Sequence, residues 1–276
     1  MSNVRDLRGS IGRGGRGLAL DRRSLLIGGG AAVGLAVAWA AWPRAGAVAI
    51  NHAPGEQLFG NFLKIGRDGR VTVMVPQAEL GQGAYTVFAQ IVADELGADW
   101  RTVAVEPAPL SAAYANVLLL DEDALLATPR ALVPESLSAI GGWRRRVLAG
   151  SAPAMLTGNS TTERMFDAPA REAAAVARAM LCMEAARRWD ADWQTCEARD
   201  GFVTLAGRRL RFADLAEGAA QRDPPGFPPL RQPGSGPLFG QPLPRLDLPS
   251  KIDGSFAFAG DVRLPGMLYA AIRQGP

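Results

Sequence analysis

The spacing of hydrophobic residues changes between Val71 and Leu96, and two glycines stand where it changes. Alternating β-branched residues at Val71–Val75 predict a strand. Apolar residues that recur three and four positions apart from Phe88 to Leu96 predict one face of a helix, which we expect from about Ala84. The triplet Gly81-Gln82-Gly83 is therefore expected at a helix N-terminus. Free backbone amides and the positive end of the helix dipole favour a polar ligand there.

The chemistry of this triplet allows two interpretations. Glycines at positions 81 and 83 let a ligand approach the backbone without meeting a side chain. The amide of Gln82 can donate and accept hydrogen bonds at once, which suits the edge of a heterocycle. A Gly-x-Gly triplet is also typical of a tight turn that binds nothing. The triplet alone therefore leaves a binding loop and a simple turn open.

A second polar cluster, Gly158-Asn159-Ser160-Thr161-Thr162, precedes an alanine-rich helix that we expect over Pro169–Trp189. Pro169 fits the first turn of that helix, where no proline N–H is needed. Three consecutive hydroxyl groups beside a glycine can surround a phosphate or a pterin with donors. The same residues are typical of an ordinary helix-capping loop, so both interpretations stay open.

The first 49 residues have the composition of an export signal. Arg22 and Arg23 stand before an uncharged apolar run, residues 25–42, which favours the twin-arginine route and a periplasmic protein. A plain membrane anchor is the alternative, because the run is only marginally short for a spanning helix. The whole chain has a net charge of +3, and this segment carries seven arginines and two aspartates, so the remainder is net −2. A basic nucleic-acid-binding protein is therefore not expected.

Cysteine and histidine are too few for a metal cluster. Cys182 and Cys196 show no C-x-x-C spacing, so neither a zinc site nor an iron–sulfur cluster is predicted. Cys182 is expected to be a buried, inert thiol, and whether the two cysteines form a disulfide stays open. The lone histidine, His52, excludes a Ser/His/Asp triad and is expected at the surface.

The remaining patterns predict an α+β fold: a mixed sheet with helices on one face. Apolar runs 62–65 and 71–75 flank an Asp-Gly turn and predict a hairpin, and residues 103–105 predict a further strand. A second hairpin is expected over 196–205 and a short helix over 212–220. Residues 117–127 and 132–139 have no clear pattern, although Ser136 could cap a helix that contains Trp143 and three arginines.

This pattern divides the chain into four parts. They are a signal or anchor segment (1–49), an α+β domain (50–222), a proline-rich linker (223–250) and the truncated start of a second domain (251–276). The last part has too few residues for a core of its own.

Several acidic and amide side chains lie near the two polar loops. Gln77, Glu79 and Glu106 are either partners that support the loops or exposed residues at strand ends, and exposure is the commoner outcome. Asp94 and Glu95 are expected together on the polar side of their helix. They are rejected as a catalytic pair, because adjacent helical residues do not face each other.

Four stretches in order resemble the molybdenum hydroxylases, the xanthine dehydrogenase and aldehyde oxidase family. They are DRRSLLIGG, VPQAELGQGAYTVFAQIVADELGADWRTVAVEPAP, LTGNSTTERMFDAPAREAAAVARAMLCMEAARRW and RLDLPSKIDGSFAFAGDVRLPGMLYAAI. The chain is most similar to the N-terminal portion of the molybdopterin-binding large subunit of the exported branch. That branch includes proteins like the β subunits of isoquinoline 1-oxidoreductases and the membrane-associated aldehyde dehydrogenases.

The resemblance implies a cofactor, a reaction and partners. By position, the residues that would bind molybdopterin, expected in its cytosine dinucleotide form, are Gly81, Gln82, Gly83, Ser160, Thr161 and Thr162. The complete enzyme would hydroxylate aldehydes or N-heteroaromatic rings. It would pass electrons to a small [2Fe–2S] subunit and possibly on to a cytochrome.

The resemblance also marks what the chain is not expected to do alone. The family's catalytic glutamate lies beyond the last matching stretch, so no catalytic residue and no metal ligand is assigned. The chain is expected to need the C-terminal part of the large subunit and to be inactive without it. The alternatives are a non-catalytic exported α+β binding module and an inactive fragment. Membrane contact is expected only through the N-terminal segment.

Overall fold

The structure, a computed structural model, describes residues 48–122, 155–226, 228–232 and 234–275. All but the last two residues of the expected signal segment lie outside these ranges. The stretch that contains Ser136, Trp143 and the arginine run also lies outside them. Within the described ranges, no helix is long and apolar enough to cross a membrane.

A mixed four-stranded sheet positions the first polar loop, as the alternating pattern predicted. Its order is β1 (Gln57–Phe59), β2 (Leu63–Ile65), β3 (Val71–Val75) and β4 (Val103–Pro107). The first three strands pair antiparallel, which confirms the hairpin, and β4 pairs parallel to β3. A parallel neighbour needs a crossover, and helix α2 supplies it. Strand β1 was not predicted.

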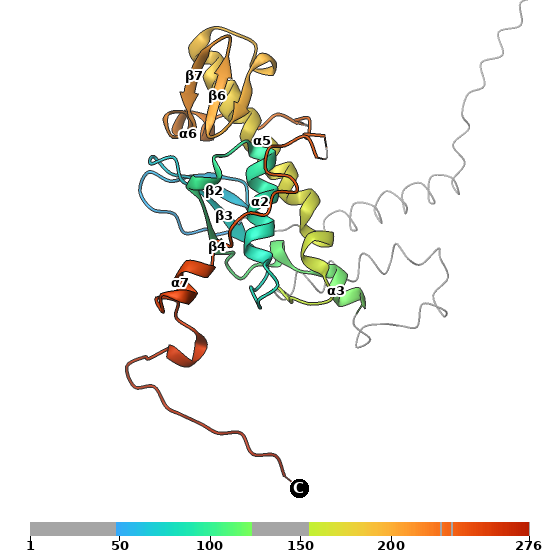
Figure 1. Cartoon of the computed structure of the whole chain (residues 1–276), viewed down its shortest axis with the longest axis vertical. Helices are drawn as coiled ribbons and strands as arrows, with labels where there is room; N and C mark the ends of the chain where they lie inside the picture. Colours follow the sequence, from blue (N-terminus) through green and yellow to red (C-terminus); the bar gives the residue numbers. More distant parts are fainter. Residues whose placement is uncertain (1–47, 123–154, 227, 233, 276) are drawn as a thin grey trace, which may run out of the picture. The chain divides into compact units, whose positions relative to one another are not determined.

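Helix α2 (Ala84–Leu96) is bounded by glycines, as the sequence predicted. Gly83 at its start and Gly97 at its end both have positive φ, 87° and 81°, which glycine adopts without steric cost. α2 packs against β3, β4 and the long helix α5 (Figure 1). The apolar side chains that the sheet and these helices bury together include Leu63, Ile65, Val73, Phe88, Val92, Leu96, Phe166 and Leu181.

Helix α5 begins earlier than the sequence predicted. It spans Thr161–Trp189, so the expectation of a start at Pro169 is wrong. Pro169 lies inside the helix, where it removes one backbone donor. Burial of Phe166, which lies before the proline, against the core favours the additional turns. The hydroxyl cluster therefore forms the start of α5 and does not precede it at a distance.

A second sheet follows α5, and type I′ turns explain its form. Strands β5 (Glu197–Arg199), β6 (Phe202–Leu205) and β7 (Arg208–Arg211) pair antiparallel in sequence order. Positive φ at both central residues of each turn, 200–201 and 206–207, is the geometry that tight hairpins prefer. This confirms the hairpin over 196–205, and helix α6 (Phe212–Ala220) matches the predicted short helix. Strand β7 was not predicted.

Short helical segments complete the part of the chain that the structure describes. They are η1 (Trp100–Thr102), η2 (Ala112–Tyr114), α3 (Val117–Glu122), η5 (Trp193–Thr195), α7 (Leu248–Ile252) and η6 (Ala259–Asp261). Beyond α7, residues 253–275 are exposed throughout. The expected boundary between linker and second domain falls within α7, and the division of the chain stays a prediction.

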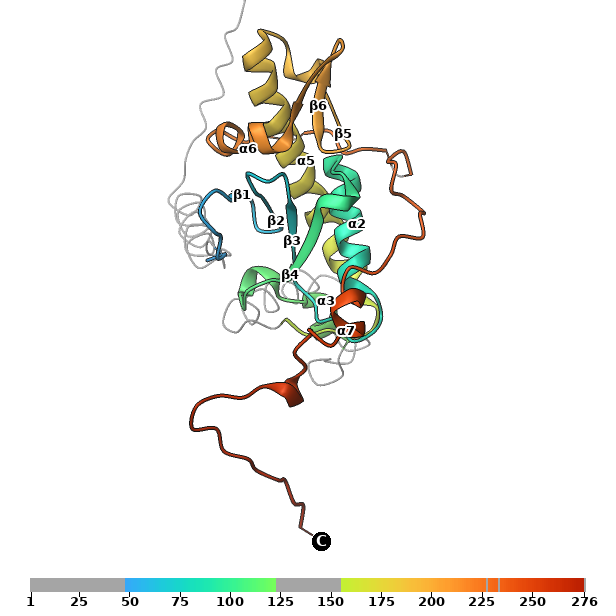
Figure 2. The same cartoon turned by 60° about the vertical axis from the view of Figure 1, so that its left-hand side comes forward.

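The proline-rich stretch combines irregular segments with turns and is attached to α2 by hydrogen bonds. We call residues 234–247 the strap. The strap runs beside α2 toward α7 (Figure 2). Its Leu238 and Leu246 amides donate to Asp94 (2.8 Å) and to the Thr86 hydroxyl (3.1 Å) on α2.

Candidate functional site

The glycine loop, residues 77–83, connects β3 to α2 and is organised around Glu79. The carboxylate of Glu79 accepts hydrogen bonds from the amides of Gly81 (2.7 Å), Gly83 (3.0 Å) and Tyr85 (3.2 Å). Its side chain is only 5% exposed, and Arg245 of the strap lies 3.2 Å from it. The amides that were expected to be free for a ligand are therefore bound by a carboxylate of the same loop. A carboxylate is favourable at a helix N-terminus because the free amides and the positive end of the helix dipole attract negative charge, as they would attract an anionic ligand.

The protonation state of Glu79 follows from these contacts. Burial alone would raise its pKa. The amides of Gly83, Tyr85 and Gly81 and the charge of Arg245 outweigh burial, and the pKa of Glu79 lies below its ordinary value. Glu79 is therefore a fixed negative charge at neutral pH, and it is a partner of the loop and not an exposed strand-end residue.

Gln82 lies exposed at the tip of the loop and closes it. Its side-chain oxygen accepts from the Leu80 amide, and its side-chain nitrogen donates to the Ala78 carbonyl (2.8 Å). Each of these atoms keeps capacity for a second hydrogen bond. Gln82 can therefore offer a ligand one donor and one acceptor while it holds the loop closed.

The hydroxyl loop, residues 155–160, lies against the glycine loop. The Ala78 amide donates to the hydroxyl of Thr157 (2.9 Å). Asn116, which is fully buried, donates from its side chain to Thr161 Oγ1 (2.6 Å) and to the Leu156 carbonyl (2.9 Å). The same nitrogen lies 3.4 Å from Gln77 Oε1. These contacts bring the two loops together. A single site formed by both loops requires this arrangement.

The residues of the hydroxyl cluster differ in what they can offer a ligand. Ser160 is exposed, has a left-handed backbone with φ 50°, and its side chain makes no capping hydrogen bond to α5. Thr161 is fully buried, and its hydroxyl donates to the Gly158 carbonyl (2.7 Å). Thr162 is also buried. Ser160 can therefore contact a ligand directly, whereas Thr161 shapes the start of α5.

The combined surface fits a polar heterocycle such as a pterin. A Cβ added at Gly81 or Gly83 would meet nothing within 4 Å, so the outer face of the loop is open. The free hydrogen-bonding capacity belongs to an amide side chain and a hydroxyl, which suit the mixed donors and acceptors of a neutral ring edge. A bare anion fits less well at the glycine loop, because the backbone amides there already donate hydrogen bonds to Glu79.

The other acidic and amide residues are placed as follows. Gln77 is buried and contacts Asn116 between the loops, whereas Glu106 is half exposed and pairs with Lys64 (3.1 Å). The expectation that Glu95 lies on the polar side of α2 is wrong, because its side chain is 2% exposed. Donors from α5 and the chain before the strap compensate the burial of Glu95: Arg171 at 3.0 Å, Arg178 at 2.8 Å and the Arg231 amide at 2.9 Å.

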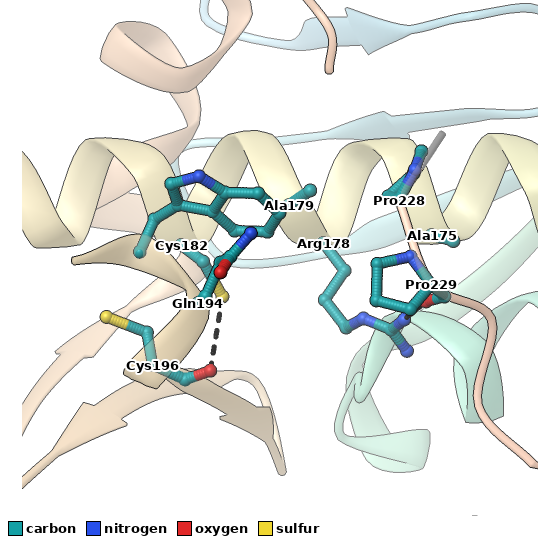
Figure 3. A pocket seen from close by; sticks show the side chains of 9 residues that line it. Ala175, Arg178, Ala179, Cys182, Gln194, Cys196, Pro228 and Pro229 are labelled. Atoms are coloured by element: carbon teal, nitrogen blue, oxygen red, sulfur yellow. Dashed lines mark hydrogen bonds between the residues drawn. The ribbon is translucent and has the colours of Figure 1, made fainter. Parts of the chain in front are cut away.

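A separate cavity of about 380 Å³ lies beside the middle of α5, along residues 175–182. Figure 3 shows it between α5, η5 and the Pro228–Pro229 segment. Arg178 in its wall is 17 residues beyond Thr161, roughly 25 Å along the helix. The cavity is thus distinct from the loop pair.

Both cysteines line this cavity as free thiols. The Cys182 thiol points to the Cys196 carbonyl (4.0 Å), and burial raises the pKa of Cys182 to about 12, as expected of an inert thiol. His52 is exposed, as predicted. No group of three or more histidine, cysteine, aspartate or glutamate side chains that could hold a metal is found within the described ranges.

Sequence reasoning missed the residues that hold the loops together. Asn116 and Thr157 lie in irregular segments, and Arg245 lies in a stretch that its composition marks only as a linker. Glu79 was considered as a partner of the loops, and its position just before two glycines is the only sequence signal for that role.

Comparisons with known proteins gave one family match and several similar proteins. Residues 28–114 match the model of a molybdopterin cofactor-binding domain. The chain is 30% identical over 295 residues to the beta subunit of isoquinoline 1-oxidoreductase from Brevundimonas diminuta, a match that covers 93% of this chain and 34% of that protein. It is 28% identical over 238 residues to the B subunit of nicotinate dehydrogenase from Pseudomonas putida, with coverage of 85% and 17%.

Two further similarities were found. A membrane-bound pyrroloquinoline-quinone aldehyde dehydrogenase from Gluconacetobacter polyoxogenes is 27% identical over 231 residues, with coverage of 81% and 25%. The solved structure of quinoline 2-oxidoreductase from Pseudomonas putida 86 gives a TM-score of 0.37 at 20% identity, over 60% of this chain and 17% of that one. The chain spans about a third or less of the length of the curated relatives.

Proposed function

We infer that this chain, which carries the molybdopterin-binding domain of a xanthine dehydrogenase and aldehyde oxidase family large subunit, holds that cofactor between its glycine loop and its hydroxyl loop. The family assignment confirms the resemblance read from the sequence.

The observation that carries the proposal is the junction of the two loops. Two segments almost 80 residues apart in sequence meet through the Ala78–Thr157 hydrogen bond and through the buried side chain of Asn116. Gln82 and Ser160 are the exposed polar groups on the two sides of this junction. We assign the direct contacts to these two residues. Gly81 and Gly83 leave room for the ring, and Thr161 and Thr162 fix the start of α5.

Bound molybdopterin would supply the molybdenum redox centre of an oxidative hydroxylation. This chain would contribute binding and orientation. The Gln82 amide would set the position of the ring edge, and Ser160 would donate from the opposite loop. The ionised Glu79 side chain would keep the loop closed, and the amides of Gly81 and Gly83 would stay bonded to Glu79 and would not contact the ligand.

The names of the relatives extend the proposal to partners. Two of them are called subunits, so we propose that this chain acts with other subunits, among them a small [2Fe–2S] protein that accepts the electrons and possibly a cytochrome. The substrate class is aldehydes or N-heteroaromatic rings, in agreement with the relatives' names. We further propose the cytosine dinucleotide form of the cofactor, and export to the periplasm by the twin-arginine route on the strength of Arg22 and Arg23.

The proposal is tested by cofactor content. The full chain is produced with a [2Fe–2S] partner protein in a host that makes the cytosine dinucleotide cofactor. Molybdenum is measured by mass spectrometry and the pterin by its fluorescence after oxidation. We expect about one of each per chain, and a severalfold loss in Gln82→Ala. The matched control is Gln221→Ala, an exposed glutamine at the end of α6. A folded wild-type chain without pterin contradicts the proposal.

A further inference from the structure

Arg245 connects the strap to the glycine loop. Its guanidinium lies at the end of the strap and donates to the Gly81 carbonyl (3.0 Å). It also lies 3.2 Å from the carboxylate of Glu79. A residue 164 positions away in sequence thus contacts both the loop backbone and the carboxylate that orders it.

Asp247 holds this guanidinium in place. The aspartate is buried and accepts two hydrogen bonds from Arg245, at 3.0 and 2.8 Å. Lys251 of α7 adds a third contact to the same carboxylate at 2.6 Å. Paired, forked hydrogen bonds of this kind fix the plane of a guanidinium as well as its charge. Arg245 is therefore presented to the loop in one orientation.

The strap is itself attached along the length of α2. Besides the bonds to Asp94 and Thr86, the Gln90 side chain donates to the carbonyls of Leu238 and Gln241. Gly236 lies so close to Asp94 that an added Cβ would overlap the carboxylate. Arg245 therefore extends from a backbone that is fixed relative to the helix whose N-terminus carries the loop.

We propose that Arg245 is a positioning residue for the cofactor loop, acting through Glu79 and the Gly81 carbonyl to hold the loop in its binding form. The inference rests on the proposed function for its consequence, cofactor retention, but its structural core concerns this chain alone. Arg245 neutralises the charge of Glu79 next to the loop and anchors the peptide before Gln82. Without it, the loop loses one carbonyl anchor, and the Glu79 carboxylate is free to turn toward solvent.

The test compares hydrogen exchange in the full chain, without cofactor, for the wild type and for Arg245→Gln. Arg101→Gln is the matched control, because Arg101 makes the same forked contact with an aspartate two residues away, Asp99, but lies in η1, beyond the end of α2 that is opposite to the loop. We expect the amides of Gly81, Gly83 and Tyr85 to exchange about tenfold faster in Arg245→Gln. They should be unchanged in Arg101→Gln, and peptides from β3 and α5 should be unaffected in both.

A conservative variant separates positioning from folding. Arg245→Lys keeps the charge but cannot contact Asp247, Glu79 and Gly81 together in a planar fork, so we expect intermediate protection. If Arg245→Gln does not fold, Arg245→Lys alone decides: faster exchange confined to the loop supports the inference, and wild-type exchange overturns it. Glu79→Gln should expose the same amides.

Cofactor retention gives an independent readout. In the co-expressed complex, Arg245→Gln should lose pterin severalfold on gel filtration, and Arg101→Gln should not. A wild type without pterin would overturn the proposed function and leave the exchange result standing. Unchanged loop exchange in Arg245→Gln would overturn the positioning role whatever the pterin content.

Discussion

Gly97→Ala is expected to destabilise the chain well beyond the usual cost of losing a glycine. Gly97 ends α2 with a φ of 81°, and its amide bonds to the Ala93 carbonyl. An added Cβ would lie 2.3 Å from the carbonyl oxygen of Ala198 on β5 and 3.0 Å from Arg231 Nη2. The nearest obstacle is backbone, which cannot rotate away as a side chain would.

The free-energy cost of Gly97→Ala has a backbone part and a packing part. A non-glycine residue in the left-handed region costs about 1–2 kcal/mol. Relief of the clash requires β5 to move away, which weakens the bond from Gly201 to the Gly97 carbonyl (2.9 Å) and the bond from Arg231 to Ala198. Two hydrogen bonds and local overpacking together cost roughly 2–3 kcal/mol. The total is about 3–5 kcal/mol.

Gly207→Ala is the control, because Gly207 has almost the same φ, 82°, and no atom within 4 Å of an added Cβ. Its cost should be only the backbone part, about 1–2 kcal/mol. Urea unfolding of the full chain, followed by circular dichroism and extrapolated to water, measures both. Equal losses in the two variants would refute the reasoning, because the contact between α2 and β5 would then contribute nothing.

Two other predictions address the acid range and the hydroxyl cluster. The hydrogen bond from Arg187 lowers the pKa of Glu184 from 4.5 to about 2. Two more arginines act in the same direction, and burial opposes them. The stabilisation that the ionised Glu184 gives is therefore complete above pH 4.5 and is lost as the pH falls toward 2. Glu184→Gln should lower the free energy of unfolding at pH 7 by on the order of 2 kcal/mol and flatten its fall between pH 5 and 2; an unchanged acid profile in urea titrations would contradict this. Thr161→Ala should lower the free energy of unfolding by about 1–3 kcal/mol because it leaves the Asn116 amide short of one partner. Ser160→Ala should change it by less than about 0.5 kcal/mol yet reduce pterin retention, and the reverse pattern would show that the two hydroxyls were assigned the wrong roles.

Much of the fold could be predicted because its signals are local. The limits of α2 follow from hydrophobic spacing and two glycines, and the hairpin over 196–205 follows from Asp200-Gly201. Strand β7, Arg208–Arg211, was missed because its side chains are mostly exposed and charged. Only the turn at Ala206-Gly207 and pairing with β6 make it a strand.

The two loops of the candidate site could be found from the sequence, but the residues that support them could not. Both loops carry recognisable residue types, so each could be found from the sequence. The burial of Glu95 could not, because its partners Arg171 and Arg231 lie 76 and 136 residues away. The start of α5 at Thr161 was missed because Pro169 is a strong local signal that tertiary packing overrides.

A structure of the chain with its cofactor bound would test the central claim most directly. The account predicts the pterin ring at the junction of the two loops, within hydrogen-bonding distance of both the Gln82 side chain and the Ser160 hydroxyl. Glu79 should still hold the amides of Gly81 and Gly83. A pterin that contacts only one loop, or that lies in the cavity beside Cys182, would contradict it.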